Sequence, residues 1–192
     1  CCGSVLLRTG FQEDALEIMK ETLNDLKGEK VLVSCAGCYR TFKLDYPELL
    51  GEEVDVIHSS QFFHQLIQEG NLQPSVNEDE VTYHDPCHLG RHEGVYDAPR
   101  EVLGAINGVE LVEMPRNKAN AWCCGGGSIV STAFPELSGD IAADRASEAA
   151  ATGAELIVSA CPSCEGNLTP DARKAKMKVY DLNVLVAEAM GI

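Results

Sequence analysis

Nine cysteines in a repeated pattern constrain this chain more than any other feature of its sequence. A Cys-Cys-Gly step opens the chain at Cys1 and recurs at Cys123, and each is followed further on by a Cys-x-x-Cys step, at Cys35 and Cys161. Adjacent cysteines bridge each other poorly, and an odd count leaves one thiol over, so a disulfide framework is disfavoured. The pattern predicts metal or cluster ligation, with redox chemistry at the Cys-x-x-Cys steps as the alternative.

An internal repeat organises the segments between these cysteines. In each copy Cys-Cys-Gly is followed by a helical pattern, a short apolar run, the Cys-x-x-Cys step, another short strand and another helix. The strands are expected at 31–33 and 54–57 in the first copy, and at 156–158 and 177–180 in the second. Upstream, the second copy also carries an expected strand at 81–87, a helix at 98–106 and a strand at 109–114.

Several residues mark where these helices should begin. Thr9 and Gln12 have the spacing of a capping box, and Pro135 suits a first helical turn. Asp97 and Asp181 stand where an N-cap is expected, just before apolar helical patterns.

The order of elements predicts an α/β fold. Short runs rich in β-branched residues, with helices on both sides, favour parallel strands in β-α units. We expect two pseudo-symmetric repeats, the C-terminal part of the first in residues 1–78 and the complete second in residues 79–192. The first repeat lacks its N-terminal part, including a partner for Cys87, so we expect the natural protein to continue upstream.

Five cysteines per complete repeat suggest an unusual centre. In a parallel sheet the C-terminal strand ends share one edge, so separate loops can bring five thiolates to one point. Zinc and a cubane iron–sulfur cluster each need four ligands. Gly125, Gly126 and Gly127 would let backbone N–H groups approach cluster sulfurs, although three glycines also suit a flexible turn.

The histidines and the single tryptophan are less specific signals. His84, His88 and His92 surround Cys87 at intervals of four, where capping or loop hydrogen bonds are favoured over a metal role. His58 and His64 suit the edge of the core or the surface. Trp122 fits either a shield for a cluster or a core anchor.

The charge and the missing motifs exclude several functions. The formal net charge of −15 argues against nucleic-acid binding, which needs a basic face. No apolar run approaches a membrane span and no signal peptide opens the chain, which predicts a cytoplasmic protein, attached to the inner face of the membrane only through a partner. Neither a nucleophile elbow nor a dinucleotide fingerprint occurs.

These motifs resemble those of the cysteine-rich CCG-domain family, most closely the catalytic subunits of heterodisulfide reductase. The family motif is Cys, a gap, Cys-Cys-Gly, a second gap, and Cys-x-x-Cys, usually present twice. Here the gap between Cys87 and Cys123 is 35 residues, and that between Cys124 and Cys161 is 36. The flanking segments YHDPCHLGR and SCAGCYRT also match.

The resemblance implies two noncubane [4Fe–4S] clusters that reduce the mixed disulfide of coenzyme M and coenzyme B by one-electron transfers. One cluster would be held by Cys87, Cys123, Cys124, Cys161 and Cys164. Four of the five ligands of the other would be Cys1, Cys2, Cys35 and Cys38, and a zinc ion is the alternative occupant there. The anaerobic methane-forming metabolism of the family would be the setting.

The resemblance also implies partners in a multi-subunit complex. The chain needs an electron donor, and it carries neither a flavin site nor a ferredoxin-type cysteine run. A ferredoxin-like or flavoprotein subunit, or a membrane cytochrome, would supply electrons. The competing functions are an electron-transfer subunit of another oxidoreductase complex, with one cluster and a structural zinc, and a zinc-stabilised docking module.

Overall fold

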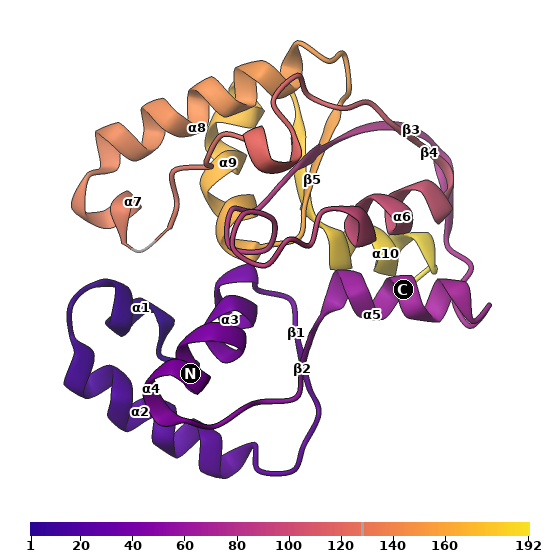
Figure 1. Cartoon of the computed structure of the whole chain (residues 1–192). Coiled ribbons are helices and arrows are strands. Elements are labelled where there is room, and N and C mark those ends of the chain that lie inside the picture. Colours follow the sequence, from indigo (N-terminus) through magenta and orange to yellow (C-terminus); the bar gives the residue numbers. More distant parts are fainter. Residues whose placement is uncertain (128) are drawn as a thin grey trace.

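The computed structural model describes residues 1–127 and 129–192, which form two lobes joined side by side (Figure 1). The first lobe contains α1 (Ser4–Arg8), α2 (Gln12–Asp25), β1 (Val31–Val33), α3 (Ala36–Arg40), the π-helix η1 (Thr41–Asp45), α4 (Tyr46–Leu50), β2 (Val56–His58) and α5 (Ser59–Gln68). The second contains β3 (Ser75–His84), α6 (Asp97–Ala105), β4 (Asn107–Leu111), the 3-10 helix η2 (Lys118–Asn120), α7 (Val130–Ala133), α8 (Pro135–Ala150), β5 (Leu156–Ser159), α9 (Pro162–Lys174), β6 (Lys178–Asp181) and α10 (Leu182–Ala189).

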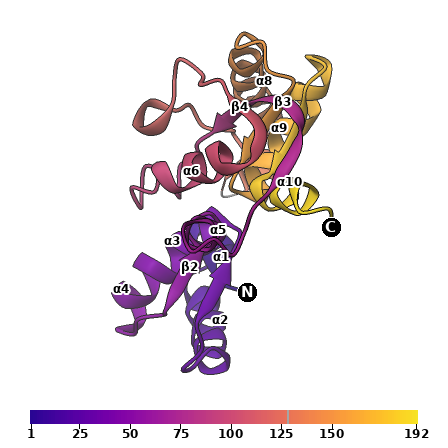
Figure 2. The same ribbon diagram turned by 90° about the vertical axis from the view of Figure 1, so that its right-hand side faces the viewer.

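Both lobes are built on parallel strands, which confirms the expected α/β architecture. The first lobe pairs β1 with β2, and the second has the strand order β4-β3-β5-β6. Helices α8 and α9 lie on one side of the larger sheet and α6 and α10 on the other (Figures 1 and 2). All four residues of β5 are buried, as expected for a parallel strand covered on both faces.

The strand order fixes where a ligand can bind. Strand β4, which follows β3 in the chain, pairs with one edge of β3. Strand β5, which comes next in the chain, pairs with the opposite edge of β3. The direction in which successive strands are added to the sheet therefore reverses between β3 and β5. In open α/β sheets such a switch point leaves a crevice at the C-terminal strand ends, where ligands bind.

The helix boundaries agree with some of the predicted signals and not with others. Pro135 begins α8, and the Asp181 carboxylate accepts a 2.9 Å hydrogen bond from the backbone of Asn183, as a cap should. Asp97 lies one residue inside α6 instead of before it. The capping box predicted at Thr9 is wrong: Thr9 ends α1, and its hydroxyl donates back to the Val5 carbonyl at 2.8 Å.

Helices α3 and α9 begin within the two Cys-x-x-Cys steps, where the sequence pattern predicts no helix. None of the helices in the described part of the chain combines the length and apolar character needed to cross a membrane.

Candidate functional site: a cysteine-lined cavity

The Cys-x-x-Cys steps stand in the same local structure in both lobes. Cys35 follows β1 as the N-cap of α3, and Cys161 follows β5 as the N-cap of α9. Cys38 and Cys164 come three residues later in those helices. Positions three apart share one face of a helix, so each pair directs both thiols to the same side.

The remaining cysteines enter from loops at the same edge. Cys87 lies in the turn after β3, next to the switch point between β3 and β5. Cys2 stands just before Gly3, the N-cap of α1, and Cys124 lies in the loop between η2 and α7. The expectation that three separate loops bring thiols together at the C-terminal strand ends is therefore met in the second lobe.

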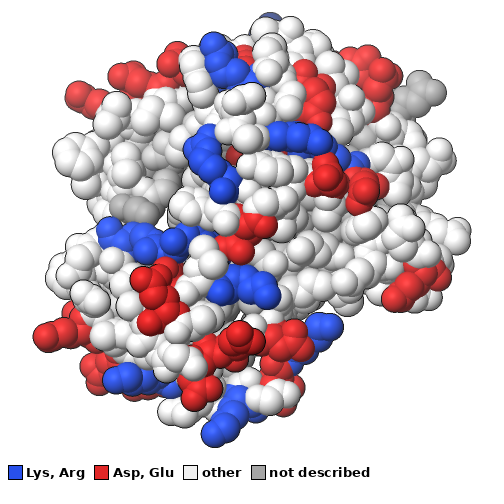
Figure 3. Space-filling view, in the orientation of Figure 1, with Lys and Arg blue, Asp and Glu red and all other residues white. Residues whose placement is uncertain are grey.

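All nine cysteines line one cavity, with a volume of about 260 Å³. Cys1 and Cys123 are exposed, whereas Cys2, Cys124, Cys161 and Cys164 are buried. The surface is hollowed between the two lobes on the left of Figure 3, with Lys and Arg side chains along the border of the hollow. The cavity thus belongs to both lobes at once.

The thiols inside it interact with one another in an unbroken series. The Sγ atoms of Cys2 and Cys38 lie 3.2 Å apart. Cys35 interacts with Cys38 in its own lobe and with Cys161 in the other. The whole series runs through Cys2, Cys38, Cys35, Cys161, Cys164, Cys124, Cys123 and Cys87.

The pKa values of these thiols are driven apart by their mutual hydrogen bonds. Hydrogen bonds from Cys161 and Cys38 lower the pKa of Cys35, and those from Cys124 and Cys87 lower the pKa of Cys123. The donors carry the opposite shift: the pKa values of Cys38 and Cys87 are raised, because each gives its S–H to a neighbouring thiolate.

This set of ligands suits a bound cation. Within the thiol series, one ionised sulfur opposes the ionisation of the next, because like charges repel in a low dielectric. A metal ion removes that conflict, since coordination deprotonates each thiol outright. A cavity lined by nine sulfur ligands therefore fits thiophilic metals or iron–sulfur clusters, and by ligand type it disfavours magnesium or calcium.

The Cys-Cys-Gly steps share one backbone conformation. Gly3 has a φ of 81° and Gly125 a φ of 83°, in the left-handed region that favours glycine. In the second copy the Gly125 N–H points to the Cys123 Sγ at 3.3 Å, and the Gly126 N–H to the Cys124 Sγ at 3.4 Å. Gly127 lines the cavity. Two of the three glycines thus direct backbone N–H groups at cysteine sulfurs.

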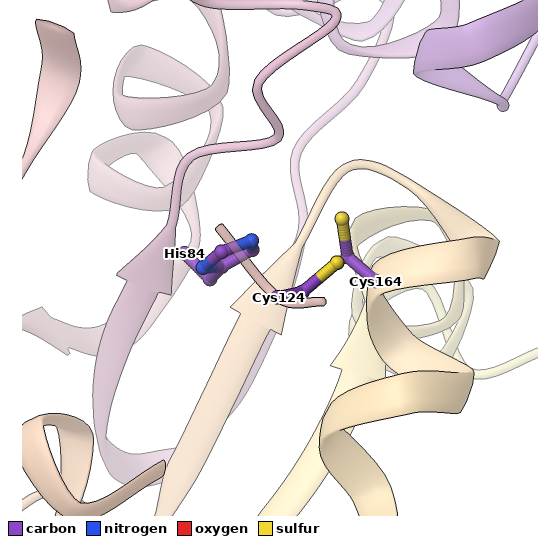
Figure 4. Close-up of side chains that lie close together, drawn as sticks. All are labelled: His84, Cys124 and Cys164. Carbon is purple, nitrogen blue, oxygen red and sulfur yellow. The ribbon is translucent and has the colours of Figure 1, made fainter. Parts of the chain in front are cut away.

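The three clustered histidines do not share a helical face, because the segment after His84 is a turn. His84 is buried, and one of its ring nitrogens lies within 4.8 Å of the Cys124 and Cys164 sulfurs (Figure 4). His88 lines the cavity and stacks edge-on against His92 at 5.1 Å. The Arg40 Nε donates to His92 Nδ1 at 3.3 Å, a loop hydrogen bond of the kind expected for these histidines.

The remaining two histidines and the tryptophan interact with residues outside the cysteine cavity. His58 is wholly buried and caps α5, and His64 pairs with Glu101 at 2.9 Å. Trp122 is 44% exposed, with the Arg116 guanidinium 3.7 Å from the centre of its ring. It is therefore no core anchor, and it is not among the residues that line the cavity.

Two polar residues next to the site, the half-buried Asn167 and the buried Arg145, were missed from the sequence. Asn167 on α9 donates to the Cys124 carbonyl at 2.6 Å and so holds the Cys-Cys-Gly loop. Arg145 is wholly buried on α8, and its Nε donates to His84 Nδ1 at 3.0 Å. A signal for Arg145 does exist in the sequence, because it interrupts a stripe of small residues formed by Ala142, Ala146 and Ala149.

Comparison with known proteins agrees with this site. A sequence model of the Cysteine-rich domain family (CCG) matches residues 1–43 and 81–169. One of the subunits of dihydromethanophenazine:CoB–CoM heterodisulfide reductase is 44% identical in Methanosarcina acetivorans and 45% in Methanosarcina mazei, over 100% of this chain and 50% of each relative. A probable iron-sulfur-binding oxidoreductase of Bacillus subtilis is 37% identical over 94% of this chain and 26% of its own length.

The chain spans about half the length of the heterodisulfide reductase subunits that it matches. The resemblance inferred from the cysteine motifs is confirmed by this similarity. The chain belongs to the CCG family of cysteine-rich domains and is homologous to these subunits of heterodisulfide reductases, which are oxidoreductases.

Proposed function

We propose that the chain is part of an iron–sulfur subunit that reduces the CoM–CoB heterodisulfide or a related disulfide. The observation that carries the proposal is the single cavity lined by all nine cysteines. The related subunits of the two Methanosarcina species bear the name of the same reaction.

In this proposal each lobe contributes one set of ligands. The second set is Cys87, Cys123, Cys124, Cys161 and Cys164, which would hold a noncubane [4Fe–4S] cluster. The first set is Cys1, Cys2, Cys35 and Cys38, four of five ligands for a second such cluster. Gly125, Gly126 and Gly127 would line the cluster, with the first two directing N–H groups at ligand sulfurs.

The two lobes would be two copies of one repeat, with residues 1–78 the C-terminal part of the first and 79–192 the complete second. Three correspondences support this assignment. Gly3 and Gly125 share their conformation, Cys35 and Cys161 both cap a helix after a strand, and the parallel pair β1–β2 corresponds to β5–β6.

The reaction balances with two electrons and two protons, which convert one disulfide into two thiols. Iron–sulfur clusters would supply the electrons one at a time. Both ligand sets line the same cavity, so both would act on one small molecule bound there. The electrons would come from a ferredoxin-like or flavoprotein subunit, or from a membrane cytochrome, in a multi-subunit complex.

The metal content tests this proposal most directly. The whole protein that carries this chain is purified without oxygen and analysed for iron, zinc and acid-labile sulfide. We expect about eight irons with matching sulfide, four for each cluster. The substitutions Cys2→Ser and Cys123→Ser should each remove about half of the iron, and the wild-type protein should release thiols from the heterodisulfide when supplied with a reduced dye.

A second candidate is an electron-transfer subunit with one cluster and a structural zinc. It is favoured by the similarity to an oxidoreductase that is not named as a disulfide reductase. About four irons and one zinc per chain, with no thiol release, would establish this function instead.

A further inference from the structure

A buried histidine lies next to two cysteines of the second set, Cys124 and Cys164, and a buried arginine contacts that histidine. His84 is the last residue of β3 and is 1% exposed, and Arg145 on α8 is 0% exposed. Figure 4 shows the His84 imidazole directed toward Cys124 and Cys164, and its ligand atom lies within 4.8 Å of their sulfurs. A histidine in this place can act on a metal centre in two ways, as a ligand or as a hydrogen-bond donor to the sulfurs.

Arg145 decides between these two roles. A guanidinium group has only donors, and the Arg145 Nε lies 3.0 Å from His84 Nδ1. Nδ1 must therefore offer its lone pair, so a neutral His84 carries its proton on Nε2.

Metal ligation through Nε2 would require the opposite tautomer. The proton would move to Nδ1, where it would face the Arg145 N–H. Arg145 is held against turning away, because its Nη1 donates to the Arg116 carbonyl at 2.9 Å and to Glu148 Oε2 at 2.7 Å. The arrangement therefore opposes ligation by His84 and leaves an N–H group for the sulfurs.

We propose that His84 is a fixed N–H donor to the sulfurs of the second cysteine set and not a metal ligand, and that Arg145 is the positioning residue that sets its tautomer. The role in redox chemistry rests on the proposed iron–sulfur cluster at this set. Reduction adds negative charge to a cluster, and an N–H donor stabilises that charge. His84 thus raises the reduction potential of the second centre.

The test compares variants of the whole protein purified without oxygen. His84→Leu removes the donor at similar volume, His84→Gln retains an amide N–H, and His64→Leu is the control, since His64 lies on α5 and pairs with Glu101. Iron content and the midpoint potential of each centre, followed by electron paramagnetic resonance, are measured. We expect His84→Leu to retain the wild-type iron content and to shift the reduction equilibrium of one centre about tenfold against reduction, about 59 mV for one electron.

The His84→Gln variant should recover much of that shift, and His64→Leu should leave both potentials unchanged. Loss of iron from both His84 variants, with the fold retained by circular dichroism, would make His84 a ligand and overturn the proposal. An unchanged potential in His84→Leu would overturn it as well.

A second readout is independent of redox activity. In protein labelled with ¹⁵N-histidine, the His84 resonances, identified by their loss in His84→Gln, should show a proton on Nε2 and none on Nδ1. A proton on Nδ1 would refute the role of Arg145. Wild-type protein without iron would instead contradict the proposed function, and the ¹⁵N spectrum of that sample would still decide the tautomer.

Discussion

At the scale of single residues, the two glycines of the Cys-Cys-Gly steps are constrained to different degrees. A Cβ on Gly125 would lie 2.7 Å from the Ser138 backbone oxygen, in the neighbouring helix α8. A Cβ on Gly3 would lie 2.7 Å from the Met19 side chain, which is flexible and can shift. The second copy therefore has the tighter loop, and its glycine is the one that the fold cannot easily replace.

The substitution Gly125→Ala should consequently destabilise the protein strongly. The left-handed conformation alone costs a non-glycine residue about 1–3 kcal/mol, and the contact with a backbone atom adds to this. Gly127→Ala is the matched control, because a Cβ there meets nothing within 4 Å. Urea denaturation of both variants measures the difference, and equal midpoints would contradict the assigned strain.

At the scale of secondary structure, corresponding strands in the two lobes end in buried polar caps. His58 ends β2 and accepts a hydrogen bond from the Ser60 N–H at 3.2 Å, at the start of α5. Asp181 ends β6 and accepts one from the Asn183 N–H at 2.9 Å, at the start of α10. Burial shifts both pKa values toward the neutral form, to about 4 for His58 and about 6 for Asp181.

The Asp181 carboxyl makes the stability of the protein depend on pH, in a direction that its pKa shift fixes. Its pKa is raised in the folded state, so the folded protein binds its proton more tightly than the unfolded chain does. Stability therefore falls as pH rises from about 4, the unfolded value, to about 6. Relative to Asp181→Asn, which keeps a capping side chain, the wild type should lose about 1 kcal/mol between pH 5 and pH 7.

Denaturation midpoints of both proteins at the two pH values check this prediction. The difference between wild type and variant isolates Asp181 from the cysteines, which titrate in both. A difference in stability between the two proteins that is constant with pH, or a wild type that gains stability relative to the variant toward pH 7, would show that burial does not control this carboxyl.

The strands and the clustering of the cysteines could be predicted from the sequence, because both have strong local signals. The runs at 31–33 and 156–158 are short, apolar and flanked by helices, and the paired cysteines mark the loops after them. The sequence did not predict contacts that join distant segments, such as Arg145 with His84 or Asn167 with Cys124. Such contacts depend on the crossing of α8 and α9 over the sheet, which no local pattern encodes.

The same limit explains the error at Thr9. A Thr with Gln three residues later favours a capping box, but it cannot show that a preceding helix already ends there. Thr9 closes α1, and the chain needs Gly10 and Phe11 to turn before α2 begins. The local sequence pattern correctly indicated a helix here, but the end of α1 and the turn before α2 set where that helix begins.

At the scale of the whole molecule, several contacts join the lobes. Helix α5 in the first lobe packs against α6 and α10 in the second. The Arg40 Nε of the first lobe donates to His92 Nδ1 of the second at 3.3 Å. Cys35 and Cys161 line the same cavity from the two lobes. A metal centre bound by either set of cysteines would therefore support the contact between lobes as well as its own loops.

Removing the metal should thus loosen the junction before the rest of the fold. If the proposed clusters are extracted by oxidation and chelation, the buried thiols lose the cations that allow all of them to ionise, and metal-binding energy is folding energy. We expect a loss of about 5 kcal/mol, which lowers Tm by roughly 10–20 °C for a chain of this size. Amide exchange should accelerate first at the N-terminal turns of α3 and α9, which carry Cys35 and Cys161.

Helix α2 is the internal control, because none of its residues lines the cysteine cavity. Its protection should fall later, together with the global unfolding of the protein. If α2 and the two cysteine-bearing helices lost protection together, the metal would stabilise the molecule as one cooperative unit. If α3 and α9 kept their protection without metal, the thiols would serve only as ligands, and contacts such as the packing of α5 and the Arg40–His92 hydrogen bond would hold the lobes together.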